Sequence, residues 1–106
     1  MSAYLTVQIN ITSEQRWPEY RAAVGPLAQR FGGHYIVAGG VKVDVLEGSH
    51  DGRSVVVLEF PSMEAIHRFW NSPQYDEVKK LREGSAELDV WAPPGMPTAN
   101  PAAWKP

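Results

Sequence analysis

The sequence lacks several features that would define its chemistry directly. None of its 106 residues is a cysteine, which excludes a disulfide framework, a thiolate nucleophile and a cysteine-bound metal. Lysine and arginine total 10 against 12 acidic residues, without a basic run, so we expect no nucleic-acid partner. No apolar run approaches membrane length, and the N-terminus shows no signal-peptide pattern. These absences predict a cytoplasmic protein that has no membrane partner.

Two kinds of cofactor motif are also missing. The chain has no Gly-x-Gly-x-x-Gly sequence and no phosphate-binding loop, so a nucleotide cofactor is not expected. Its histidines, His34, His50 and His67, are too far apart in sequence to show metal-ligand spacing. The sequence therefore predicts that the protein uses no cofactor and no metal.

The most informative stretch that is present spans residues 53–61, RSVVVLEFP. Its β-branched residues and the final Pro61 predict a central β-strand. Side chains alternate between the two faces of a strand, so one face is wholly apolar from Val56 to Phe60. The other face ends in Glu59, after two valines. A carboxylate in that setting needs an explanation, because an unpaired buried charge is costly.

Hydrophobic periodicity predicts the elements around this strand. We expect helices over 17–31, after Ser62 and again after Ser72-Pro73, where each serine caps a helix. The order strand–helix–strand–strand–helix–strand is typical of the ferredoxin-like split βαβ arrangement, an α+β fold with an antiparallel sheet. The further strands are expected at residues 4–11, 34–38, 41–46 and 86–91.

The chain divides at the end of its last predicted strand. Residues 1–92 are predicted to form one α+β domain. Residues 93–106 hold five of the nine prolines and are predicted to form an extended tail. We expect Trp104 to anchor this tail against the body, since an indole stabilises a structure only when it is buried.

Right-handed crossovers place both helices on one face of the sheet and leave the other face bare. The predicted open face mixes apolar and polar groups, so we expect a second copy of the chain to cover it and form a homodimer. The predicted covered face comprises Leu5, Val7, Ile9, Tyr35, Val37, Val56, Leu58, Phe60, Leu88 and Val90. The predicted open face comprises Tyr4, Thr6, Gln8, His34, Ile36, Val55, Val57, Glu59, Asp89 and Trp91.

Strand directions bring four of these residues to one edge of the open face. Tyr4, His34, Glu59 and Trp91 lie at strand ends that meet there. Glu59 is a candidate general base and His34 a candidate acid/base partner. The alternative is structural: for Glu59 a dimer-interface ion pair or a hydrogen bond with a backbone amide, and for His34 a solvated imidazole.

Further residues are candidates for contacting a small organic molecule. Tyr4, Gln8 and Trp91 would wall a pocket on the open face. Tyr75 and Arg82 share a helix face at a spacing of seven residues and are also candidate substrate contacts. Arg82 has the alternative of pairing with an acidic residue of the last strand.

Several segments together resemble the family called domain of unknown function 1330. The resemblance covers residues 4–90 and implies a dimeric α+β barrel of two facing ferredoxin-like sheets. Arginine is common in the family where His34 and Ala38 stand here, which weakens any expectation of an anionic substrate at the open face. The segments that carry the resemblance are GGHYIVAGG (32–40), VLEG (45–48), VLEFPS (57–62), NSPQY (71–75) and Leu81-Arg82.

Broader relatives of this barrel include cofactor-free monooxygenases, isomerases, dehydratases and cyclases. The resemblance and the placement of Glu59 and His34 lead us to expect a cofactor-independent enzyme for small molecules, with proton-transfer chemistry of the isomerase, cyclase or dehydratase kind. The alternative is a non-catalytic dimeric protein that binds a small molecule or serves as an accessory protein.

Overall fold

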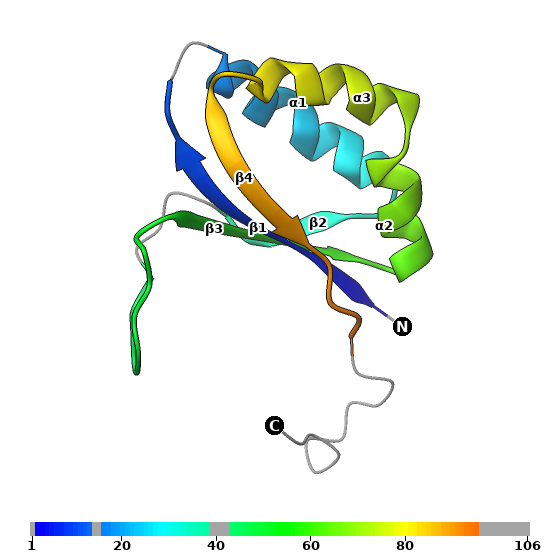
Figure 1. Cartoon of the computed structure of the whole chain (residues 1–106). Coiled ribbons are helices and arrows are strands. Elements are labelled where there is room, and N and C mark those ends of the chain that lie inside the picture. The colour runs from blue at the N-terminus through cyan, green and yellow to red at the C-terminus, as the bar shows by residue number, and fades with distance from the viewer. Residues whose placement is uncertain (1, 14–15, 39–42, 96–106) are drawn as a thin grey trace.

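The computed structural model describes residues 2–13, 16–38 and 43–95. In the described part of the chain, the elements follow the predicted order strand–helix–strand–strand–helix–strand, and the second helical region is divided into α2, α3 and η1 (Figure 1). The elements are β1 (Ala3–Ile11), α1 (Trp17–Arg30), β2 (His34–Val37), β3 (Ser54–Phe60), α2 (Met63–Trp70), α3 (Pro73–Lys79), the 3-10 turn η1 (Lys80–Arg82) and β4 (Ala86–Trp91).

Local signals in the sequence explain where the helices begin and end. The Ser62 side chain accepts a hydrogen bond from the Ala65 amide at the start of α2, and Ser72 accepts one from the Tyr75 amide at the start of α3. Helix α1 continues across Pro26, and Gly32 follows it with a φ of 90°. That left-handed conformation favours glycine and ends the helix.

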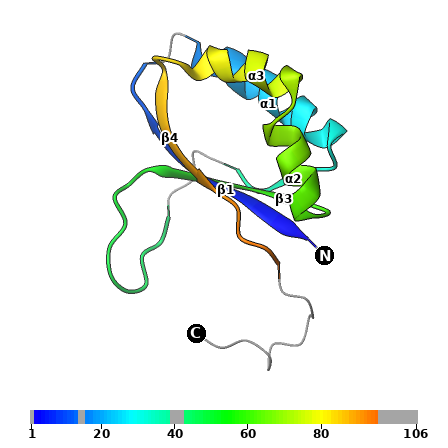
Figure 2. The same cartoon turned by 45° about the vertical axis from the view of Figure 1, so that its right-hand side comes forward.

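The sheet has the strand order β2-β3-β1-β4, and every neighbouring pair is antiparallel. This confirms the predicted α+β class with β3 between β1 and β2. Both views show the helices stacked over one face of the sheet, while the other face carries no helix (Figures 1 and 2). The faces are therefore unequal: one is covered by the chain itself and one is open.

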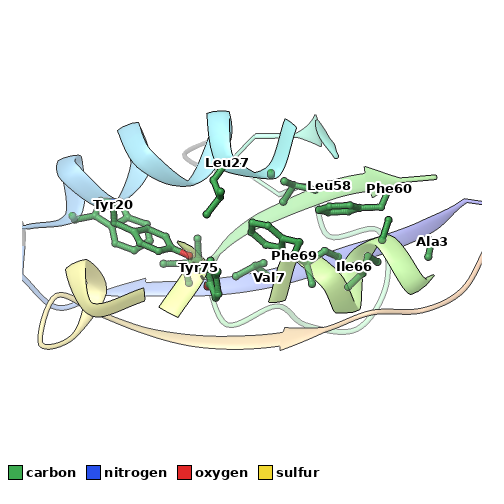
Figure 3. Packing of buried hydrophobic residues seen from close by; sticks show 14 residues of the cluster. Ala3, Val7, Tyr20, Leu27, Leu58, Phe60, Ile66, Phe69 and Tyr75 are labelled. Carbon is green, nitrogen blue, oxygen red and sulfur yellow. Dashed lines mark hydrogen bonds between the residues drawn. The ribbon is translucent and has the colours of Figure 1, made fainter. Parts of the chain in front are cut away.

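The covered face holds the hydrophobic core, in which aromatic rings from α1, α2, α3 and β3 meet (Figure 3). Phe69 is 1% exposed, and its ring centroid lies 5.6 Å from that of Phe60 and 4.8 Å from that of Tyr75. Gly33 permits this packing, because a Cβ there would lie 2.5 Å from the Phe60 ring. Together these contacts fix the sheet beneath the helices.

Strand β2 differs from the prediction in length and in exposure. Tyr35 and Val37 were expected in the core, yet they are 43% and 38% exposed. The cause lies in the edge position of β2 and in a bulge, since Tyr35 pairs with Leu58 but Val37 pairs with Val57. The extra residue shifts the alternation, so Val37 lies on the open face with its partner.

The strand predicted at 41–46 is wrong for the part that the structure describes. Residues 43–46 form no strand, and Leu46 is 96% exposed; residues 41 and 42 lie outside the described residues. Residues 43–53 instead project to the open side of the sheet (Figures 1 and 2).

The chain continues along β1 after β4 ends. The Tyr4 amide donates to the Pro93 carbonyl at 3.1 Å, and the Gly95 amide donates to the Ser2 carbonyl at 2.8 Å. The first residues assigned to the tail thus lie against the start of β1. The rest of the tail, including the predicted anchor Trp104, lies outside the described residues.

Candidate active site

The antiparallel register brings three predicted site residues into one row across the open face. Glu59 lies opposite Tyr4 on β1 and opposite His34 on β2. Side chains that are directly opposite on neighbouring strands have Cβ atoms about 4.5–5.5 Å apart, so the three groups can touch. The row forms because the last residues of β3 pair with the first residues of β1 and of β2.

Both carboxylate oxygens of Glu59 have a contact in this row. The His34 Nε2 atom lies 3.2 Å from Oε1, and the Tyr4 hydroxyl donates to Oε2 at 3.3 Å. The side chain of Glu59 is 30% exposed and that of His34 is 57% exposed. In a single chain the row therefore faces solvent, and a second surface would be needed to enclose it.

The Tyr4 phenol responds to the carboxylate beside it. The Glu59 charge, with smaller contributions from burial and the hydrogen bond between them, raises the pKa of Tyr4 above its usual value. A phenolate next to a carboxylate would be repelled, so Tyr4 keeps its proton and acts as a donor to Glu59.

Trp91 lies one step along the open face from this row. It pairs with Thr6, which also lies opposite Val57, and it is 45% exposed. The structure thus places Trp91 on the predicted face, beside the row but not in it. The next row across the open face therefore consists of Trp91, Thr6 and Val57, with Thr6 in the middle.

Gln8 belongs to a different polar cluster, centred on Arg53. The guanidinium donates to the Gln8 side-chain oxygen, to Asp89 and, at 2.7 Å, to Asp51. The backbone amide of Arg53 also donates to Asp51, and this contact, followed by the side-chain bond and the charge, lowers the pKa of Asp51. Gln8 is therefore held by Arg53, away from Glu59.

Sequence reasoning did not assign a role to Arg53. The signal was present, because the alternation that places Val55, Val57 and Glu59 on the open face also places Arg53 there. The open face consequently has two polar ends, with Glu59 at one and Arg53 at the other, and the row of Trp91, Thr6 and Val57 lies between them.

Tyr75 and Arg82 lie away from the row. Tyr75 is 2% exposed inside the core on the covered face, where its hydroxyl lies 3.0 Å from that of Tyr20. Arg82 is part of η1, and its Nε atom is buried without a hydrogen-bond partner among the described residues. The expected pairing of Arg82 with Glu87 or Asp89 is not formed among the described residues, and Asp89 is bound by Arg53.

The row can hold and move a proton. Histidine is the side chain that changes charge near neutral pH, and a carboxylate beside it can accept a proton from a substrate. Tyr4 can donate a hydrogen bond but is held against Glu59. Within residues 2–13, 16–38 and 43–95, no three histidine or carboxylate side chains gather closely enough to hold a metal ion.

Comparisons with known proteins agree on the fold. The model of the family described as domain of unknown function (DUF1330) matches residues 2–96. No curated protein sequence matches the chain.

No helix in the described part of the chain has both the length and the apolar character to cross a membrane.

Three solved structures show how widely this fold is used. The RPA0582 protein of unknown function from Rhodopseudomonas palustris has a TM-score of 0.70 and 20% identity, over 92% of this chain and 84% of that one. SnoaB, a cofactor-independent oxygenase from Streptomyces nogalater, has a TM-score of 0.63 and 10% identity, over 92% and 96%. The hydroxynitrile lyase from Passiflora edulis has a TM-score of 0.67 and 17% identity, over 93% and 97%. At these identities the likeness establishes a shared fold, on which enzymes of different chemistry occur.

Proposed function

This chain belongs to the family of domain of unknown function 1330, and we propose that it is a cofactor-independent enzyme that moves a proton on a small, partly apolar organic molecule. The observation that carries the proposal is the row in which both oxygens of Glu59 have a contact, one with His34 and one with Tyr4. Such contacts position a carboxylate, and positioning is what general acid–base catalysis requires.

In the proposed reaction Glu59 is the base and His34 is its partner. Glu59 accepts a proton from an activated carbon of the substrate, and the same carboxyl group or His34 returns it to another atom. The carbon–hydrogen bond that breaks leaves its electron pair on the substrate, so the step needs no oxidant or reductant. Trp91 would contact the apolar part of the substrate.

The proposed pocket is completed by a second copy of the chain on the open face. The row faces solvent in one chain, and covering it would remove water from around Glu59. The segment 43–53 projects to the same side and exposes Leu46 almost fully, which suits contact with a partner subunit. An interface of standard size buries about 1,600 Å² in total.

A direct test uses a probe that reports a base in a water-poor pocket. The probe is 5-nitrobenzisoxazole, whose N–O bond breaks when a base removes its carbon-bound proton. Glu59→Gln should lower kcat/KM for the probe by about 10²–10⁴-fold, the usual contribution of a positioned base. The nearly isosteric amide should leave folding intact, which circular dichroism checks.

His34→Ala should lower the same rate less than Glu59→Gln if His34 only orients the base. A wild-type rate no higher than that of acetate buffer, or a rate that Glu59→Gln leaves unchanged, contradicts the proposal. The function would then be the alternative one, a non-catalytic dimer that binds a small molecule. The contacts on both oxygens of Glu59 also suit that role, as an ion pair at an interface.

A further inference from the structure

A cavity lies on the covered face, at the end of the sheet opposite to Glu59. It has a volume of about 260 Å³ and lies between the first turns of α1 and the sheet. Its walls come from Trp17 and Arg21 of α1, Ile9 of β1, Tyr35 of β2, and Ser54 and Val56 of β3. A smaller cavity of about 70 Å³ shares Ile9, Trp17, Tyr35 and Val56, so it continues the first one into the core.

This space is a cleft that runs from the surface, where Arg21 and Ile11 are exposed, down to the buried Trp17 and Ile9. An apolar cavity of about 150 Å³ is large enough to take a benzene ring. The larger cavity therefore has room for a single ring, and its walls of Trp17, Tyr35 and aliphatic side chains suit one.

The inner end of this space carries a pair of phenols. The Tyr20 and Tyr75 hydroxyls lie 3.0 Å apart, and both side chains line the smaller cavity (Figure 3). One phenol donates to the other, which leaves the proton of the second available to a ligand. Burial, followed by the neighbouring Tyr75, raises the pKa of Tyr20, so this phenol keeps its proton at neutral pH.

The outer end carries a positive charge. Arg21 lines the larger cavity, is solvent-exposed, and has no ion pair with a carboxylate among the described residues. Its guanidinium lies close enough to the Tyr35 phenol to counter, in part, the raising of the Tyr35 pKa by burial. An arginine at the opening of an apolar cavity can bind a carboxylate through two parallel hydrogen bonds.

We propose that this cavity is a ligand site for a single-ring aromatic carboxylate, with the ring between Trp17 and Tyr35 and the carboxylate on Arg21. The site is separate from the row of Glu59 and His34, on the other face and at the other end of the sheet. It does not depend on that row being catalytic.

The test measures binding of benzoate by NMR, with benzamide as the neutral analogue of the same shape. Two indole N–H signals report the two faces: Trp17 lines the cavity, and Trp91 lies on the open face. Benzoate should shift the Trp17 signal saturably and leave the Trp91 signal in place. Benzamide should bind more weakly, because it cannot pair with Arg21.

Arg21→Gln should weaken benzoate about tenfold, as expected for losing a hydrogen bond to a charged group, and should leave benzamide unchanged. Arg30→Gln is the matched control, because Arg30 is an exposed arginine in the last turn of the same helix. Ser54→Phe should block both probes by filling the cavity from β3.

Three results would overturn the proposal. The first is the absence of a saturable Trp17 shift with benzoate. The second is benzoate binding that is equally strong in Arg21→Gln. The third is a shift of Trp91 in place of Trp17, which would move the ligand to the open face. Since binding is measured without a reaction, each of these results can be distinguished from a failure of the proposed catalytic function.

Discussion

The two faces of the sheet are stabilised by different interactions. Along β1, Leu5, Val7 and Ile9 are 5–8% exposed beneath the helices, while the alternate residues Tyr4 and Gln8 remain accessible. Core packing holds the first set in place, because each side chain must fill a fixed space. Hydrogen bonds and charges hold the second set: Tyr4 donates to Glu59, and Gln8 accepts from Arg53. A single strand therefore carries stability on one face and candidate chemistry on the other.

The largest effect should come from breaking the covered face. Phe69→Ala removes a ring that contacts Phe31, Phe60 and Tyr75 and should cost about 3–5 kcal/mol of unfolding free energy. Val7→Ala on the covered face and Val55→Ala on the open face remove the same two methyl groups, and the second should cost less, about 1 kcal/mol or below. Urea denaturation measures all three variants. Equal costs for the two valine variants would mean that the two faces do not differ as described.

Sequence alone was sufficient for most of the fold and for the row. Alternation and strand order placed Tyr4, His34 and Glu59 together, because register in an antiparallel sheet follows from topology once one face is buried. The same reasoning failed at Val37, where a bulge shifts the alternation. Bulges depend on how an edge strand twists, which no local sequence signal in 34–38 indicated.

The parts that sequence missed depend on packing in three dimensions. The position of Tyr75 on its helix does not show that its ring lies in the core, where it is 2% exposed. The cavity beside α1 could not be predicted either, since its volume depends on where the helix lies over the sheet. Gly25 is part of that placement, because a Cβ there would lie 3.3 Å from the Tyr35 ring.

The next effect tests whether the open face is covered in solution. Val57 lies at the centre of that face, opposite Thr6 and Val37. If a second copy packs there, Val57→Lys should weaken the dimer by more than about 100-fold, because an unpaired charge would be buried. Val57→Thr is the control of similar shape. Light scattering checks the mass, and a wild-type monomer at micromolar concentration would contradict the homodimer.

A smaller effect is expected in the free energy of unfolding at alkaline pH, where the buried Tyr20 on the covered face should make it fall. The pKa of Tyr20 is raised by burial, so above about pH 10 the unfolded chain loses this proton while the folded chain keeps it. The free energy of unfolding should then fall by up to about 1.4 kcal/mol per pH unit from this group. Tyr20→Phe should remove that part of the slope in urea titrations between pH 9 and 11. An unchanged slope would show that Tyr20 titrates normally.

The smallest effect concerns the row itself and needs no substrate. The Glu59 charge is the largest cause of the raised pKa of Tyr4. Replacing Glu59 by Gln removes this charge but keeps a side chain of the same shape, so the pKa of Tyr4 should fall back toward its ordinary value. NMR titration of the Tyr4 ring measures it, with Glu64→Gln on α2 as the control, since Glu64 contacts Arg68 and not Tyr4. A Tyr4 titration that is the same with and without the Glu59 carboxylate would mean that the two groups are not in contact in solution, and the row would then lack the positioned base on which the proposed chemistry depends.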